Sequence, residues 1–226
     1  MPAVAEPRAK FDLKEALREI HIIAGLDPTN PRDSASHKPL AVGVTSPTYG
    51  DGKTTVSIAL AASLSEDFEA DVTLVDADFH TQSIGGQFGL DGETGLSDVL
   101  LGKVPLQSVT HRVAQARMNV VAAGSTPQDP ARIARSEHLT TLIDNMKRAN
   151  KYVVIDLPAA LHSMNAPVLA KRCDGVIIVV RAGRTTQSDL ERTLHLLSGA
   201  NVLGVVVNRK HSAVPTWVRR TLNMRG

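Results

Sequence analysis

Cysteine, aromatic side chains and long apolar runs are all scarce in this chain of 226 residues. Cys173 is the only cysteine, which excludes an internal disulfide and a zinc site built from several cysteines. The N-terminus lacks the apolar segment of a secretory signal. The longest apolar runs span five to six residues, far short of the roughly 20 needed to cross a bilayer. We therefore expect a cytoplasmic protein with a single globular domain.

Acidic and basic residues nearly balance, but the C-terminus is basic. The chain has 25 Lys and Arg against 23 Asp and Glu, a net charge of +2. Residues 209–226 contain five basic residues and no acidic one, so no large nucleic-acid surface is expected elsewhere. The tail also carries Trp217, Val218 and Leu222. Two roles are open for it: weak contact with an anionic membrane surface, or packing on the domain as a terminal helix.

Apolar runs and helical stretches alternate along the chain. The runs do not alternate polar with apolar residues, which is typical of parallel strands covered on both faces. The expected strands are 40–45, 72–75, 118–123, 152–155, 176–180 and 202–207, and the expected helices between them include 54–66, 138–150 and 188–199. This order predicts an α/β fold with a doubly wound, mostly parallel sheet and helices on both faces. Ligands of such sheets bind beyond the carboxyl ends of the strands.

The segment after the first predicted strand, SPTYGDGKTT, has the composition and context of a phosphate-binding loop, as in a P-loop NTPase. Its glycines let backbone N–H groups turn toward an anion, and the next helix adds the positive end of its dipole. Lys53 suits the β- and γ-phosphates of ATP, and the Thr54 hydroxyl suits Mg²⁺. A glycine-rich turn with an incidental lysine is the alternative. The predicted nucleotide-binding residues of the loop are Gly50, Asp51, Gly52, Lys53, Thr54 and Thr55.

Two other predicted strands end in aspartate. Asp76 and Asp78 follow the second strand, and the period of two in an extended chain sends both to the same side. Such a pair can hold Mg²⁺ or accept a proton from a hydroxyl group or water. Asp156 ends the strand 152–155 in the Walker B pattern, where it would orient Mg²⁺. Capping of a turn or helix is the alternative for each. We expect Thr54, Asp76 and Asp156 to hold the metal.

Other catalytic patterns are missing from the sequence. The eight histidines show no H-x-x-x-H or H-E-x-x-H spacing, so histidine ligation of a metal is not expected. There is no G-x-S-x-G sequence, and no G-x-G-x-x-G fingerprint follows a strand. The missing fingerprint argues against a dinucleotide-dependent oxidoreductase.

These motifs resemble the bacterial tyrosine kinases (BY-kinases) of capsule and exopolysaccharide export, a branch of the deviant-Walker P-loop ATPases. SPTYGDGKTT is similar to the family's SPTPGEGKST, VDADFH to its Walker A′ pattern D-x-D-x-R, and GVVVN to a further family segment. Partition and division-site ATPases carry a second lysine five residues before the loop lysine, where this chain has Thr48. Departures from the kinase pattern are Tyr49 for proline, His80 for arginine, Ala159 for proline, and a C-terminal tail without tyrosine.

The resemblance implies a role for each matching residue. Lys53 and Thr54 would bind phosphates and Mg²⁺, and Asp76 would be the general base for the attacking hydroxyl. Asp78 and Asp156 would complete the metal and water network. Asn208 falls where relatives hold the adenine, although an asparagine that caps a turn is the alternative. The implied catalytic set is Lys53, Asp76, Asp78 and Asp156.

The helical pattern at residues 12–24 fits the resemblance as well. Family members carry E-x-x-R-x-x-R on a helix that mediates oligomerisation, and here the pattern reads Glu15, Arg18 and His21. Three residues at this spacing share one stripe of a helix. A solvated ion pair on that face is the alternative. The expected organisation is an N-terminal helix and linker at 1–39, the ATPase domain at 40–210 and the basic tail at 211–226.

Together the motifs and the resemblance predict an ATP- and Mg²⁺-dependent tyrosine kinase that regulates exopolysaccharide or capsule synthesis and export. The expected partners are further copies of the chain and a membrane chain-length regulator, with no nucleic acid. The tail would permit a peripheral position at the inner face of the plasma membrane. Two alternatives remain: an ATP-dependent dimerisation switch without kinase activity, and a regulatory module that binds nucleotide without turnover.

Overall fold

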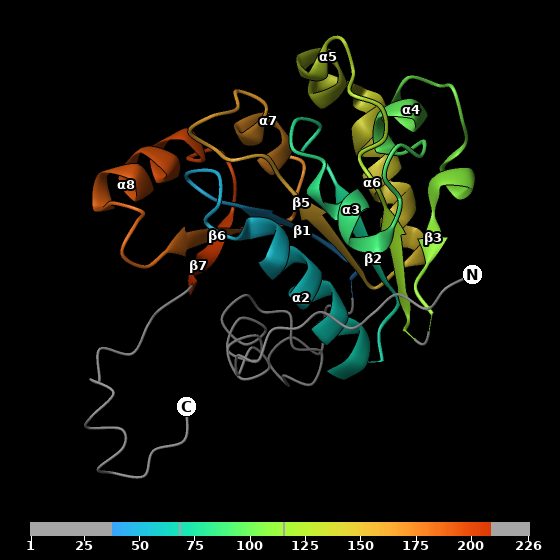
Figure 1. Cartoon of the computed structure of the whole chain (residues 1–226), viewed down its shortest axis with the longest axis horizontal. Coiled ribbons are helices and arrows are strands. Elements are labelled where there is room, and N and C mark those ends of the chain that lie inside the picture. The colour runs from blue at the N-terminus through green and yellow to red at the C-terminus, as the bar shows by residue number, and fades with distance from the viewer. Residues whose placement is uncertain (1–37, 68, 115, 209–226) are drawn as a thin grey trace.

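A seven-stranded sheet lies at the centre of the computed structural model, with helices on both of its faces (Figure 1). The structure describes residues 38–208, except residues 68 and 115. The strand order is β3-β4-β2-β5-β1-β6-β7. All neighbouring strands run parallel except the β3–β4 pair. The predicted α/β class and mostly parallel sheet are confirmed.

Each of the six predicted strands is present. The strands are β1 (Leu40–Thr45), β2 (Val72–Asp76), β3 (His111–Arg112), β4 (Met118–Val121), β5 (Tyr152–Asp156), β6 (Gly175–Arg181) and β7 (Val202–Asn208). β4 is shorter than predicted because the carbonyls of Ala122 and Ala123 accept hydrogen bonds from Leu96 and Ser97 instead of continuing the sheet. β3 was not predicted, since a two-residue edge strand has no periodicity to detect.

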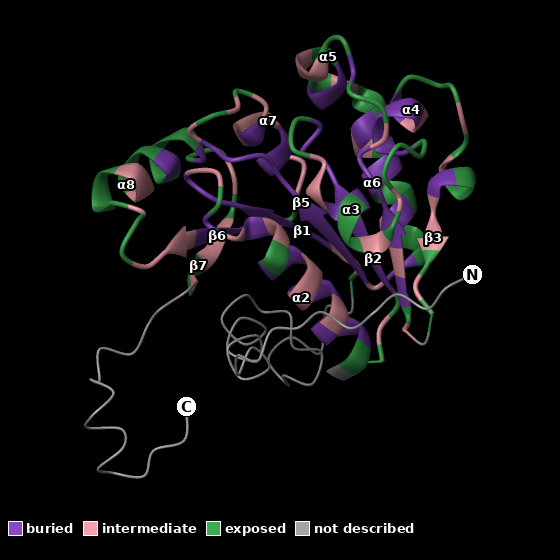
Figure 2. Cartoon of the chain, viewed as in Figure 1, coloured by how far each residue is buried: buried purple, intermediate pink, exposed green. Residues whose placement is uncertain are grey.

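The helices form two layers that bury separate apolar clusters against the sheet (Figure 2). On one face lie α2 (Lys53–Asp67) and α3 (Ser83–Phe88). The opposite cluster includes side chains of α4 (Leu96–Leu100), η1 (Leu106–Val109), α5 (Pro130–Arg135), α6 (Glu137–Ala149) and α7 (Ala166–Ala170), with α8 (Gln187–Leu196) at its margin. Because the central strands are covered on both faces, every residue of β2 and of β5 is buried.

The sequence of α6 explains why this segment is helical. The Ser136 side chain accepts a hydrogen bond from the His138 N–H and caps the first turn. Leu139, Ile143 and Met146 then recur at helical spacing and are buried. Basic residues in the last turn complement the negative end of the helix dipole. The predicted helix at 138–150 is therefore confirmed, although it begins and ends one residue earlier than predicted.

Strand register brings the ends of the predicted functional strands together. β5 lies between β1 and β2, so the carboxyl ends of these three strands meet at one edge of the sheet. Val44 and Asp76 both pair with Asp156 in the register. The residues that follow β1 therefore lie beside the aspartates that end β2 and β5.

Some predictions concern residues outside the described part of the chain. These are the N-terminal helix with Glu15, Arg18 and His21, and the basic tail. The proposed boundaries at 39 and 210 stay predictions. None of the helices among residues 38–208 is both long and apolar enough to cross a membrane.

Asp98 fastens α4 to the loop that leaves β4. Its Oδ2 accepts hydrogen bonds from the N–H groups of Gly95 (3.1 Å) and Ser125 (3.2 Å). Its Oδ1 accepts from Ser125 Oγ (2.7 Å) and Lys103 Nζ (3.0 Å). Burial alone would raise the pKa of Asp98, but these hydrogen bonds outweigh burial and hold the pKa at about 2. The ionised carboxylate therefore joins two segments far apart in the sequence.

We predict that Asp98→Asn lowers the free energy of unfolding by about 1–3 kcal/mol at pH 7, because one amide oxygen cannot replace two carboxylate oxygens. Since the folded pKa lies below the ordinary value, this contribution is present above about pH 4 and is lost as pH falls toward 2. Urea denaturation at several pH values measures it, with the exposed Asp91→Asn as control. An unfolding free energy equal to that of wild type at pH 7 would contradict the prediction.

Candidate active site

The loop between β1 and α2 has a backbone shape that depends on two glycines. Gly50 and Gly52 adopt φ values of +80° and +100°, in the region that favours glycine. A Cβ added at Gly52 would lie 2.0 Å from Asn208 Nδ2. α2 begins directly after the loop, at Lys53, so the positive end of its dipole faces the space that the loop encloses.

Hydrogen bonds hold this loop in shape. The Oδ2 of Asp51 accepts from the backbone N–H and the hydroxyl of Thr48, both at 3.0 Å. Asn208 Nδ2 donates to the carbonyl of Asp51 at 2.8 Å. On the other side, the N–H of Ala160 donates to the carbonyl of Ser46 at 2.8 Å. The loop is therefore preformed, and the predicted adenine residue Asn208 lies directly against it.

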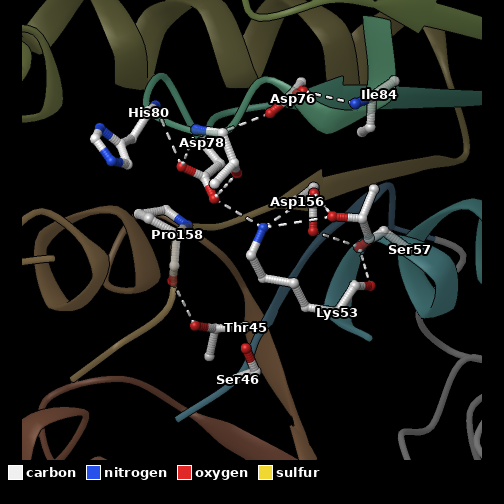
Figure 3. Close-up of polar contacts among 12 residues, drawn as sticks. Thr45, Ser46, Lys53, Ser57, Asp76, Asp78, His80, Ile84, Asp156 and Pro158 are labelled. Atoms are coloured by element: carbon white, nitrogen blue, oxygen red, sulfur yellow. Dashed lines mark hydrogen bonds and ion pairs between the residues drawn. The ribbon is translucent and has the colours of Figure 1, made fainter. Parts of the chain in front are cut away.

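Lys53 extends from the start of α2 to a point between two carboxylates (Figure 3). Its Nζ lies 2.9 Å from Asp78 Oδ2 and 3.4 Å from Asp156 Oδ2. The lysine side chain is 7% exposed and both carboxylates are fully buried. Burial alone would lower the pKa of Lys53, but the negative charges of Asp156 and Asp78 outweigh it and raise the pKa. The ammonium group is therefore charged and points into the site.

The Asp156 carboxylate accepts hydrogen bonds from two hydroxyl groups in the first turns of α2. Its Oδ2 accepts from Thr54 Oγ1 at 2.7 Å, and its Oδ1 accepts from Ser57 Oγ at 2.9 Å. Burial raises the pKa of Asp156 despite Lys53 and the hydroxyls. The structure thus places Thr54 directly beside Asp156. Ser57 was not predicted, although it lies one turn after Lys53 on the same helix face.

Asp76 and Asp78 leave the end of β2 in different surroundings. Asp76 accepts the N–H of Asp78 at Oδ1 and the N–H of Ile84 at Oδ2, both at 3.0 Å (Figure 3). Burial and the charge of Asp156 raise the pKa of Asp76 to about 7. Burial also opposes ionisation of Asp78, but Lys53 and Thr81 outweigh it and lower the pKa. One carboxyl therefore titrates near neutral pH while its neighbour stays ionised.

An open cavity of about 280 Å³ adjoins Asp78. The ring of Tyr49 stacks on His162, with centroids 4.9 Å apart and planes at 25°. The Tyr49 and His80 centroids are 6.2 Å apart. All three rings line the cavity, together with Phe79 and Pro158 among others. Pairing of Tyr49 with His162 could not be predicted, because 113 positions separate them in the sequence and no motif contains both.

The donor set fits a nucleotide with Mg²⁺. Glycines with positive φ and a helix N-terminus provide N–H donors for phosphates. The Thr54 hydroxyl and the Asp156 carboxylate are oxygen ligands of the kind that Mg²⁺ prefers. Of the predicted residues, Lys53 pairs with Asp78 and Asp156, and Thr54 donates a hydrogen bond to Asp156. Gly50, Asp51, Gly52 and Asn208 form the adjoining loop region, while Thr55 is exposed on α2.

Several known proteins are similar to this chain in sequence and in fold. A model of the ParA family, described as NUBPL iron-transfer P-loop NTPase, matches residues 39–221. Tyrosine-protein kinase CpsD of Streptococcus agalactiae serotype III (strain NEM316) is 30% identical over 180 residues, which covers 78% of this chain and 77% of that protein.

Two solved structures share the fold. The kinase domain of the Escherichia coli tyrosine kinase ETK superposes with a TM-score of 0.76 at 24% identity, covering 89% of this chain and 79% of that chain. The septum site-determining protein MinD of Pyrococcus horikoshii, complexed with Mg-ADP, gives a TM-score of 0.63 at 21% identity, covering 81% and 77%.

We predict that the Asp76 carboxyl titrates near pH 7, since burial and Asp156 oppose its ionisation, and that Asp78 titrates below its ordinary value. NMR of the protein with ¹³C-labelled aspartate carboxyls measures both, with Asp76→Asn to assign the signal. Because the folded pKa of Asp76 is raised, its contribution to stability is present below about pH 4 and is lost as pH rises through 7. A midpoint below about pH 5 for Asp76 would contradict this account.

Proposed function

The chain belongs to the bacterial tyrosine kinase branch of the ParA-type P-loop NTPases, and from this premise we propose that it is an Mg²⁺- and ATP-dependent phosphotransferase that regulates exopolysaccharide or capsule synthesis and export. The observation that carries the proposal is the buried group formed by Lys53, Asp78 and Asp156 at the end of a preformed phosphate loop. Such a group has little use in a merely structural turn, because burying charges is costly unless they serve a ligand or a reaction.

The loop residues Gly50 to Thr55 bind the phosphate chain of ATP through backbone N–H groups and the start of α2. Lys53 places a positive charge beside the β- and γ-phosphates. Thr54, Asp156 and Asp76 would hold Mg²⁺, which would neutralise charge on the transferred phosphoryl group. Asn208 fixes the Asp51 carbonyl and lies on the side of the loop that we assign to the adenine.

Asp76 is the proposed general base. A carboxyl whose pKa lies near 7 accepts a proton from a hydroxyl more readily than one with an ordinary pKa. In the proposed step the acceptor O–H proton passes to Asp76, the acceptor oxygen bonds to the γ-phosphorus, and the bond to the β-phosphate oxygen breaks. Asp78 remains ionised and keeps Lys53 directed at the phosphates.

The proposed phosphoacceptor is a tyrosine of another protein, with water as the competing acceptor. The sequence contains two tyrosines, and neither suits transfer between subunits. Tyr152 is 2% exposed within β5, and Tyr49 belongs to the phosphate loop and stacks on His162. Removing Tyr49 from that stack would disturb the loop that holds the nucleotide.

Partners and location complete the proposal. We propose that copies of the chain assemble through the stripe of Glu15, Arg18 and His21, and that the assembly works beside a membrane polysaccharide chain-length regulator. The basic tail would add weak contact with the inner face of the plasma membrane. The catalytic unit is proposed to span residues 40–210, and no nucleic-acid partner is proposed.

A non-kinase switch is the second candidate, favoured by one observation: residues 209–226 contain no tyrosine to support a cycle of tail phosphorylation. In that function, ATP binding and release would control dimerisation and the state of a membrane partner. Both candidates use the same phosphate loop, so they differ only in where the phosphoryl group goes.

We predict that Lys53→Ala weakens ATP binding by roughly 10- to 100-fold, because the variant loses a charged donor to the phosphates. Isothermal titration with Mg-ATP measures the affinity. The exposed Lys171→Ala has the same change in charge away from the loop and should bind like wild type. Thermal unfolding confirms that each variant is folded. Unchanged affinity in a folded Lys53→Ala protein would refute the phosphate-loop assignment.

We further predict that Asp76→Asn binds ATP but turns it over roughly 10²- to 10⁴-fold more slowly, the usual contribution of a general base. The measurement is incubation with γ-labelled ATP, Mg²⁺ and a tyrosine copolymer, reading phosphotyrosine and free phosphate together. Asp91→Asn is the matched control. Phosphotyrosine on the copolymer supports the kinase, whereas free phosphate without phosphotyrosine favours the switch. Wild-type turnover in Asp76→Asn would remove Asp76 from the mechanism.

A further inference from the structure

Arg184 is an exposed arginine whose guanidinium group lies against the phosphate loop. A Cβ added at Gly50 would lie 2.9 Å from Arg184 Nη1 and 3.8 Å from its Cζ. Gly50 also has a positive φ, so both the backbone shape and the space above it favour glycine. The charged group therefore covers the Cα of a loop residue. The phosphate-loop motif does not include this arginine, because 131 positions separate it from Lys53.

A tight turn between β6 and α8 holds Arg184 in this place. The N–H groups of Arg184 and Thr185 donate to the carbonyl of Arg181 at 3.1 and 2.9 Å. Arg181 in turn donates its N–H to Thr185 Oγ1 at 2.8 Å. The N–H of Ala182 donates to the carbonyl of Asn208 at 3.0 Å, which joins the turn to β7. Asn208 is the residue whose side chain holds Asp51, so turn and loop form one hydrogen-bonded unit.

The charge of Arg184 has no counterpart within the described residues, where no carboxylate forms an ion pair with it. Lys53 differs, because Asp78 and Asp156 already neutralise much of its charge. Mg-ATP is a net anion, so a loop that binds it gains from a second cation that is not already paired. A guanidinium group also presents planar N–H donors that match phosphate oxygens in pairs.

We propose that Arg184 is a phosphate-binding residue of the nucleotide site, contacting the phosphate chain of ATP or ADP across the loop at Gly50. The inference rests on the proposed function, since it assigns a further residue to the same nucleotide. It adds to the loop motif a cation from the turn between β6 and α8. The β6–α8 turn thereby becomes part of the binding site.

The test compares Arg184→Ala, Arg184→Lys and the control Arg192→Ala, which removes an exposed arginine from neighbouring α8. Isothermal titration measures the affinity of each for Mg-ADP, for Mg²⁺ with a non-hydrolysable ATP analogue, and for adenosine. We expect Arg184→Ala to weaken both phosphorylated ligands roughly 10- to 100-fold, the effect of a lost charge-assisted hydrogen bond. Adenosine affinity and thermal stability should stay at wild-type values, and Arg184→Lys should be intermediate.

Each remaining outcome overturns the inference in a recognisable way. Wild-type affinity of Arg184→Ala for both phosphorylated ligands refutes the contact while leaving the proposed function intact. An equal loss in Arg192→Ala shows a general effect of net charge instead of a contact. An equal loss for adenosine shows that the residue acts on the base or on the fold. If wild type binds neither phosphorylated ligand, the proposed function fails first and the inference with it.

Discussion

Three buried carboxylates surround one ammonium group where β1, β2 and β5 end. Asp76, Asp78 and Asp156 are each fully buried, and Lys53 is the cation that lies among them. Burial of several like charges is unfavourable unless a cation or a proton compensates them. The structure uses both means: Lys53 keeps Asp78 ionised, while Asp76 takes a pKa of about 7. The chemistry proposed for the site follows from this division of roles.

The parallel sheet makes this charge group possible. Adjacent parallel strands end at the same edge, so carboxylates that follow β2 and β5 meet the loop that follows β1 without any long connection. The apolar clusters on both faces keep water away from the strands and fix the register that pairs Asp76 with Asp156. The positions of the polar side chains at the site therefore depend on the packing of the apolar core.

Side chains at three further places lie around this centre. Tyr49 and His80 stand where the family pattern has proline and arginine, and with His162 they line the cavity beside Asp78. Arg184 lies over Gly50. Asp98 ties the β4 loop, which carries Thr126 of the cavity wall, to α4. Tyr49 belongs to the phosphate loop itself, and we propose that these features bear on nucleotide affinity and acceptor choice more than on the basic chemistry.

The local sequence determined the elements and the motif residues. Non-alternating apolar runs identified the six long strands, and the glycine–lysine spacing identified a loop whose chemistry depends on neighbouring residues. Tertiary structure decided what depends on distant residues. Asp76 and Asp78 look equivalent in the sequence. Burial and the charge of Asp156 raise the pKa of Asp76, whereas Lys53 and Thr81 outweigh burial at Asp78 and lower its pKa. Arg184, Asn208 and His162 likewise reach the loop only because strand order places β6, β7 and β5 around β1. Periodicity and spacing report short-range backbone preferences, whereas burial and charge are set by whichever segments the packed sheet brings together.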